Sequence, residues 1–157
     1  MIYSIGIDIV HIPKFKKAVE RWGDKIKKRI FTKGELAYCK NRRFSEQHLA
    51  VRFAAKEAFI KALGRGVGSK EIEVTNNSDG RPYIILNSQF PIPNLVPAGL
   101  KLSQQVPKFM SPNVPIGEKI SGTSLSREQG SELRTHLSLY HDGDYCIAQV
   151  ILETKEQ

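Results

Sequence analysis

The sequence predicts a single α+β domain, with its helices and its strands in separate blocks. A strand-like alternation of apolar residues opens the chain, helical spacing dominates residues 13–63, and two pairs of strand-like segments follow. The 157 residues suit one domain with one core, so we expect residues 1–157 to form one unit. The composition, 40% hydrophobic and 25% charged, is typical of a soluble globular protein.

Neither a membrane span nor a secretory signal is expected. No apolar run approaches the ~18–20 residues of a membrane span. The apolar N-terminus contains an acid and no small-residue cleavage site. Cys39 and Cys146 are isolated thiols without metal-binding spacing, which is typical of a reducing cytoplasm, with a disulfide between them as the alternative.

The first predicted strand covers residues 5–10. Ile5, Ile7 and Ile9 alternate with other residues and form one face of the strand. Asp8 points to the opposite face. The strand therefore has an apolar side and a side that carries one acid.

Three helices are predicted next. In the first, Pro13 is tolerated in the first turn, and Gly23 ends the helix. Asp24 can cap a second short helix. A capping box of Thr32 with Glu35 predicts a third near residues 33–40. The core-like stripe of the first helix consists of Phe15, Val19 and Trp22.

The clearest helix runs from about Ser45 to Leu63, and Gly64 lies where a left-handed C-terminal cap belongs. Its small residues allow close packing against a neighbouring element. Residues 72–74 then begin a strand, the turn residues 76–80 follow, and residues 82–86 form the returning strand of a hairpin.

A proline-rich insertion is expected at about residues 91–125, because six of the eight prolines lie between Pro91 and Pro115. We interpret it as an extended excursion within the domain. Ser126 with Gln129 can cap a short helix that ends at Leu133. Two closing strands, residues 136–139 and 145–152, then flank a turn at residues 142–143.

Positive charge is concentrated near the N-terminus. Between residues 14 and 33, nine basic residues face two acids, so this segment carries +7 of the net charge of +8. Such a face attracts an acidic partner, although a solvated helix face and a nucleic-acid partner are the alternatives. The basic residues are Lys14, Lys16, Lys17, Arg21, Lys25, Lys27, Lys28, Arg29 and Lys33.

Three side chains are candidates for metal-phosphate chemistry. Asp8 is either a structural carboxylate, capping a helix or paired with an arginine, or a ligand of Mg²⁺, which prefers carboxylate oxygens, water and phosphates. Glu57 and Lys61 lie one helical turn apart. They form either an exposed ion pair worth ~0.3–0.5 kcal/mol or a metal carboxylate beside a phosphate-binding ammonium. A nucleic-acid groove has no use for the two acids.

The C-terminal histidines have weaker functional support. His136 and Ser138 share a strand face, but no nucleophile turn surrounds the serine, so a surface histidine is the default interpretation. His141, beside Asp142, is a candidate general base.

Several stretches, taken in order, resemble the bacterial holo-acyl-carrier-protein synthases. Residues 5–10 (IGIDIV) resemble the opening GIDIV motif of that family, and residues 29–32 (RIFT), followed by Glu35 and Tyr38-Cys39, resemble its next motif. Residues 49–64 resemble its longest signature almost without a break. Residues 80–82 (GRP) and 136–141 (HLSLYH) are similar to its last two motifs. The resemblance covers residues 1–87 and about 134–153.

This resemblance implies a 4'-phosphopantetheinyl transferase fold, in which a small antiparallel sheet packs on a long central helix, with short N-terminal helices beside it. It implies transfer of 4'-phosphopantetheine from coenzyme A to a serine of apo-acyl carrier protein. The reaction depends on Mg²⁺, yields adenosine 3',5'-bisphosphate and supports fatty acid biosynthesis. The resemblance further implies a cytoplasmic homotrimer that binds coenzyme A between subunits, with no nucleic-acid or membrane partner.

Residue roles follow from the same resemblance. Asp8, Glu57 and Lys61 are the expected catalytic residues, with Asp8 and Glu57 as Mg²⁺ ligands; a carboxylate, a metal-bound water or a histidine is the base. The expected coenzyme A contacts are Arg52, Lys61, Gly64 and His136, and the expected carrier-protein contacts are Lys14, Lys17 and Arg21. Three departures from the family pattern are Lys14 for an arginine, Tyr140 for a small hydroxyl residue, and the length of segment 91–132.

Overall fold

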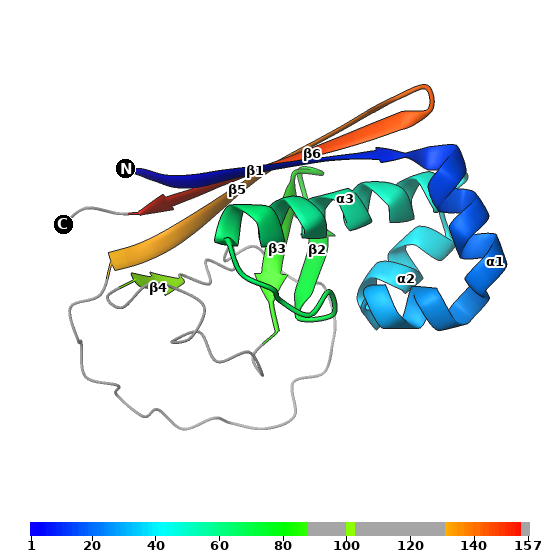
Figure 1. Cartoon of the computed structure of the whole chain (residues 1–157), viewed down its shortest axis with the longest axis horizontal. Helices are drawn as coiled ribbons and strands as arrows, with labels where there is room; N and C mark the ends of the chain where they lie inside the picture. Colours follow the sequence, from blue (N-terminus) through cyan, green and yellow to red (C-terminus); the bar gives the residue numbers. More distant parts are fainter. Residues whose placement is uncertain (88–99, 103–130, 155–157) are drawn as a thin grey trace.

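The computed structural model describes residues 1–87, 100–102 and 131–154. In this part of the chain the elements follow an α+β order, which confirms the predicted class (Figure 1). They are β1 (Ile2–His11), α1 (Ile12–Ile30), α2 (Lys33–Lys40), α3 (Ser45–Leu63), β2 (Ile72–Asn76), β3 (Pro82–Leu86), β4 (Leu100–Leu102), β5 (Ser131–Asp142) and β6 (Tyr145–Thr154).

The strands form two sheets. The larger has the order β1-β6-β5-β4, in which β1 and β5 both run antiparallel to β6, and the short β4 runs parallel to β5. The smaller is the antiparallel β2-β3 hairpin, which the turn residues 76–80 predicted. The first and last long strands of the chain are therefore neighbours, so β6 holds β1 in place.

Helix α3 packs along one face of the larger sheet, against β1 and β6, while α1 and α2 gather at one end of it (Figure 1). Because α3 is lined with alanines, its backbone lies close to the strands. Gly6 of β1 marks the closest approach: a Cβ there would overlap the carbonyl oxygen of Ala58 and lie 2.6 Å from the amide nitrogen of Ala62. The shared core includes Val10, Ala54, Ala58, Ala148 and Val150.

Local signals predicted the helix ends well. Thr32 Oγ1 accepts a hydrogen bond from the Glu35 amide at 3.2 Å, and Glu35 Oε2 accepts one from the Thr32 amide at 2.8 Å, which confirms the capping box. Gly64 ends α3 in the left-handed conformation, with φ of 71°. Gly23, with φ of 58°, interrupts α1 where the sequence predicted a break.

Trp22 was expected in the core stripe of the first helix, and this prediction is wrong, since the residue is 59% exposed. Val19 is buried as expected. The non-helical backbone at Gly23 ends the regular helix directly after Trp22, so no further turn holds the indole against α3. The Arg21 guanidinium instead lies over the indole ring, 5.4 Å from its centroid.

The C-terminal strands are longer than predicted. The prediction of a short helix that ends at Leu133 is wrong for its last residues, because β5 already begins at Ser131. There Leu133 pairs with Leu102 on one side and with Thr154 on the other, a non-local pairing that the local capping pattern does not reveal.

The proline-rich insertion and the cap at residues 126–129 lie outside the described residues, apart from β4. Among the described helices, none has the length and apolar character needed to cross a membrane.

Both cysteines are free and buried in separate clusters, Cys39 beside Phe31 and Leu49, and Cys146 in the main core. Burial raises the pKa of each thiol to about 11. At pH 8 only about one thousandth of either thiol is thiolate, the reactive form. We therefore expect neither cysteine of the native protein to react with a chromogenic disulfide reagent within minutes, and both to react in denaturant. Rapid labelling of the native protein would contradict this burial.

Candidate functional site

The predicted catalytic side chains meet where β1 crosses α3. Asp8 faces α3, because it lies on the opposite side of β1 from Ile7 and Ile9. The Lys61 ammonium donates to Asp8 Oδ1 at 2.8 Å and to the Ile7 carbonyl oxygen at 3.2 Å. Lys61 of α3 thus forms its ion pair with Asp8 of β1. The sequence alone had also allowed an ion pair between Lys61 and Glu57 on the same helix.

Glu57 completes this group. Burial raises the pKa of its carboxyl, the Asp8 carboxylate raises it further, and the Lys61 ammonium opposes both. Two carboxylates and one ammonium leave one negative charge uncompensated at the contact of β1 with α3. A divalent cation there would offset the repulsion that Glu57 experiences from Asp8.

The donor set fits Mg²⁺. This ion is typically held by one or two carboxylates and completes its coordination with water and substrate phosphates. No cluster of three or more acid, histidine or cysteine side chains suited to a metal is found among the described residues. Asp8 and Glu57 can supply two oxygen ligands to such an ion, and water or phosphate would supply the others.

Arg52 has contacts on another side of α3. It is buried, with 3% of its surface exposed, and donates to Asn76 Oδ1 at 3.0 Å and to the His48 carbonyl oxygen at 3.4 Å. Its guanidinium lies over the ring of Tyr38, 4.0 Å from the centroid. Its Nε has no hydrogen-bond partner among the described atoms. These contacts tie Arg52 to α2 and β2, whereas Asp8 lies on β1.

His136 lies on the face of the sheet opposite Asp8. It pairs with Ile151 of β6, which in turn pairs with Ile5, a residue of the isoleucine face. Its Nε2 lies 2.8 Å from Glu153 Oε2, and this hydrogen bond lowers the pKa of Glu153. The chain itself therefore does not bring His136 to Asp8.

Gly64 lies directly beyond the last turn of α3, three residues after Lys61. A Cβ built on it meets nothing within 4 Å, so its backbone is open on that side.

His141 is far from this end of the helix. Its Nδ1 lies 2.9 Å from Gln47 Nε2, and Gln47 precedes Glu57 by ten residues, about 15 Å along a helix. His141 is therefore poorly placed to act as a base beside Glu57 of the same chain.

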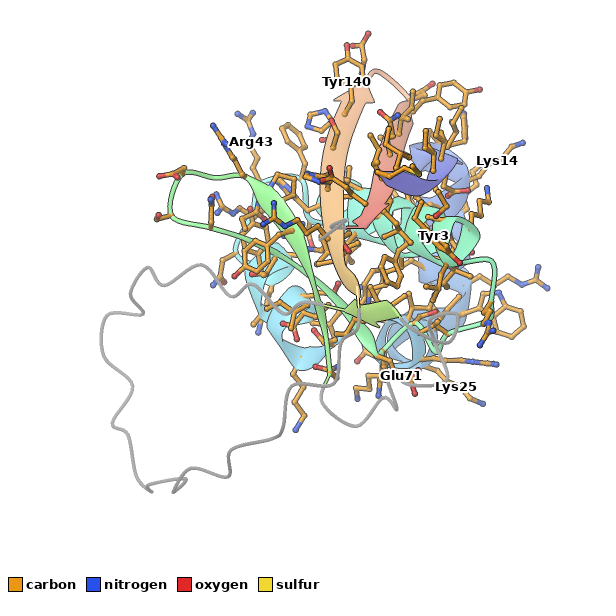
Figure 2. All side chains as sticks on the ribbon, turned by 90° about the vertical axis from the view of Figure 1, so that its left-hand side faces the viewer. Tyr3, Lys14, Lys25, Arg43, Glu71 and Tyr140 are labelled. Carbon is orange, nitrogen blue, oxygen red and sulfur yellow. The ribbon has the colours of Figure 1, made fainter. Side chains whose placement is uncertain are left out.

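The predicted carrier-protein contacts share one exposed surface. Lys14, Lys17 and Arg21 are exposed on the first half of α1. Figure 2 shows Lys14 and Lys25 projecting outward from the body of the protein. The positive charge of the N-terminal segment is thus available to a partner.

One feature of the site region was missed by sequence reasoning. Lys56, next to Glu57, is fully buried and forms an ion pair with the buried Glu35 at 2.7 Å. A signal was present, since Lys56 follows Ala54 and Ala55 in a stretch of the helix that the sequence predicted to pack closely. Its partner was not apparent, because the role of Glu35 in the capping box gives no sign of a second contact with α3.

Comparisons with known proteins agree on one family. A model described as the 4'-phosphopantetheinyl transferase superfamily matches residues 4–97. The holo-[acyl-carrier-protein] synthase of Geobacter sulfurreducens is 36% identical over 157 residues, with 98% of each chain covered. That of Trichlorobacter lovleyi is 36% identical over 159 residues, again with 98% of each chain covered.

Solved structures give the same result. The holo-(acyl-carrier-protein) synthase of Bacillus anthracis, in complex with coenzyme A (3',5'-ADP), matches with a TM-score of 0.64 and 27% identity over 99% of both chains. The coenzyme A complex of the synthase from Chronobacterium ammoniagenes matches with a TM-score of 0.65 and 28% identity over 98% of both chains.

Proposed function

The chain belongs to the holo-[acyl-carrier-protein] synthases of the 4'-phosphopantetheinyl transferase superfamily, and we propose that it transfers 4'-phosphopantetheine from coenzyme A to a serine of apo-acyl carrier protein with Mg²⁺. The products are holo-acyl carrier protein and adenosine 3',5'-bisphosphate. The observation that carries the proposal is the convergence of Asp8, Glu57 and Lys61, two acids and a cation, at the contact of β1 with α3.

In the proposed reaction the serine hydroxyl gives its proton to a base, which is a carboxylate, a metal-bound water or a histidine. Its oxygen attacks the β-phosphorus of coenzyme A, and the bond from that phosphorus to the bridging oxygen breaks, which releases adenosine 3',5'-bisphosphate. Asp8 and Glu57 would hold the Mg²⁺, which when bound neutralises charge on the diphosphate. Lys61 stabilises the negative charge that develops on the departing phosphate. Its ammonium is suited to this, since more than half of its side chain is exposed and it is already fixed beside Asp8.

The remaining coenzyme A contacts are proposed to come from two subunits. Gly64 offers an open backbone next to Lys61. His136 lies on the other face of the sheet, so it would serve the site of a neighbouring subunit. Arg52 would have to act through the Tyr38 side of α3, where its Nε is unpartnered among the described atoms.

A homotrimer is proposed from an exposed apolar surface, which we call the outer face. It is the side of β1, β6 and β5 turned away from α3; Figure 2 shows Tyr140 near its upper end. Exposed apolar surface of this extent is unusual on a monomer and marks an association site. The outer face includes Ile5 (53% exposed), Ile7 (50%), Ile9 (59%), Tyr140 (61%), Tyr145 (52%) and Ile147 (36%).

Ile7→Glu is expected to convert the trimer into monomers, because it places a charge at the centre of the outer face. Light scattering coupled to gel filtration measures the mass directly. Ser78→Glu, in the exposed turn of the β2-β3 hairpin, is the matched control and should leave the trimer intact. A monomeric native protein, or a trimeric Ile7→Glu variant, would contradict the proposed use of this face.

The basic surface of α1 is proposed to bind the acidic carrier protein. Reversing the charge of Lys14, Lys17 and Arg21 to glutamate should raise the KM for the carrier about tenfold or more, because electrostatic attraction between the partners is lost. The KM for coenzyme A should not change. Lys40→Glu on α2, outside the basic segment, is the control for a general change of charge. An unchanged KM for the carrier in the triple variant would count against this surface.

We further propose that residues 1–157 form one domain, with the insertion at about 91–125 as an excursion from it. The proposed role is in fatty acid biosynthesis in the cytoplasm, and the two free cysteines fit a reducing compartment.

Intact-mass spectrometry of apo-acyl carrier protein tests the activity. A gain of one phosphopantetheine group that requires Mg²⁺ is expected. No gain with several carrier proteins, from a folded protein that binds coenzyme A, would contradict the proposed reaction.

A further inference from the structure

A buried ion pair lies beside the candidate site without belonging to it. Lys56 and Glu35 both have side chains with no exposed surface, and their charged atoms are 2.7 Å apart. Removing two charges from water is costly, and a buried pair of this kind is often no more stabilising than apolar residues of the same volume. Its presence in the core therefore calls for an explanation other than stability.

The Lys56 ammonium joins three separate parts of the chain. It donates to Glu35 Oε2 on α2 and also to two backbone carbonyl oxygens, that of Ile30 at 2.8 Å and that of Ser69 at 2.7 Å. An ammonium has three N–H donors, so these acceptors satisfy it completely. An apolar side chain in its place could form none of these three hydrogen bonds.

Glu35 extends the same network to β2. Its Oε2 accepts from the Thr32 amide at the start of α2, and its Oε1 accepts from the Val74 amide at 2.9 Å. The two charged groups therefore fix the positions of α1, α2, α3, β2 and the loop between α3 and β2 relative to one another.

Two of these attachments lead to elements that the proposed function uses. Ile30 is the last residue of α1, the helix that carries Lys14 and Arg21. Ser69 lies in the loop that begins at Gly64, directly after Lys61 and its turn of α3. Lys56 itself is the chain neighbour of Glu57. One ammonium thus lies between the proposed carrier-binding helix, the loop that follows the proposed coenzyme A contact Gly64, and a proposed metal ligand.

We propose that Lys56 is a positioning residue for phosphopantetheine transfer, which holds the Gly64–Ser69 loop and the end of α1 in register with Glu57 and Lys61. This inference rests on the proposed function for its kinetic consequences. Its structural part, the anchoring of the loop, stands on the hydrogen bonds alone.

Lys56→Met combined with Glu35→Gln separates positioning from stability. The double substitution removes both buried charges together, so no uncompensated charge remains. The one acceptor oxygen of glutamine can keep the capping box, while the Val74 amide loses the second carboxylate oxygen that accepts from it in the native protein. The carbonyl oxygens of Ile30 and Ser69 nevertheless lose their donor. Val74→Ala is the matched control, since it lies in the same region, lowers stability by creating a cavity, and leaves Lys56 with all its bonds.

Hydrogen exchange of the free protein is the first measurement. In the native protein we expect the amides of Gly68 and Glu71, which donate to Glu71 Oε2 at 3.1 Å and to the Gly68 carbonyl oxygen at 2.8 Å, to exchange at least about tenfold more slowly than in an unstructured peptide of the same sequence. The double variant should lose most of this protection, whereas Val74→Ala should retain it. Exchange of these two amides at the unprotected rate in the native protein would overturn the inference, whatever the variants do.

Steady-state kinetics of the same proteins is the second measurement. The double variant should raise the KM for coenzyme A about tenfold and lower kcat, while Val74→Ala keeps both near the native values at a comparable melting temperature. A folded double variant with native exchange and native KM would overturn the inference. Failure of the native protein to transfer phosphopantetheine would instead contradict the proposed function, because the exchange experiment does not depend on activity.

Discussion

Alanine at Asp8 or at Glu57 is expected to abolish Mg²⁺-dependent transfer while the protein remains folded. Each substitution removes one of the two carboxylates that would hold the metal, and the ammonium of Lys61 would then repel the cation. We expect a loss of at least about a thousandfold in kcat/KM, the scale on which preorganised electrostatic groups act. Mass spectrometry of the carrier protein over time gives the rates.

Stability should change little in these variants. The ion pair of Asp8 with Lys61 involves a lysine side chain that is 56% exposed, and pairs of this kind contribute about 0–1 kcal/mol. Burial is the main cause of the raised pKa of Glu57, and removing Asp8 relieves the repulsion that raises it further. Asp79→Ala, in the exposed hairpin turn, is the control for the loss of a carboxylate elsewhere. Full activity in either site variant would show that the metal ligands have been assigned to the wrong residues.

Gly6→Ala is expected to prevent stable folding at room temperature. A Cβ at this position would overlap the Ala58 carbonyl oxygen and lie 2.6 Å from the Ala62 amide nitrogen. Both are backbone atoms in the last two turns of α3, so neither can move without displacing this end of the helix from the sheet. Overpacking of this kind costs about 1–3 kcal/mol where side chains can adjust, and more where they cannot. That is a large share of the ~5–15 kcal/mol that stabilises a typical domain.

Gly66→Ala is the matched control, because a Cβ there meets no atom within 4 Å. Its melting temperature should equal that of the native protein, while Gly6→Ala should show no cooperative transition or one that is strongly lowered. A native-like melting temperature for Gly6→Ala would mean that α3 does not approach β1 as closely as described.

Local chemistry explains which parts of the fold the sequence predicted. The capping box at Thr32, the left-handed Gly64 and the break at Gly23 each depend on a few neighbouring residues, and all three are confirmed. The strand at Leu133 was missed because its pairing partners, Leu102 and Thr154, lie far away in the sequence. Helical spacing placed Trp22 with the core residues, but spacing cannot show that the regular helix ends directly after it.

In the candidate site, too, the sequence predicted the relations within one helix and missed the contacts between elements. The spacing of Glu57 and Lys61 on one helix was enough to predict that they share a side of it. That Lys61 would bond Asp8 depends on the packing of β1 against α3, which no local pattern specifies. Lys56 was overlooked for the same reason, since its partner Glu35 lies on a different helix.

The proposed Mg²⁺ site is tested most directly by the affinity of the protein for coenzyme A with and without the metal. Isothermal titration calorimetry of the native protein, after chelation and again with saturating Mg²⁺, gives both dissociation constants. We predict that Mg²⁺ strengthens binding by at least about tenfold, equivalent to 1.4 kcal/mol, and that a variant with alanine at both Asp8 and Glu57 shows no such gain. An affinity for coenzyme A that is the same with and without Mg²⁺ would contradict a metal shared between these carboxylates and the substrate phosphates.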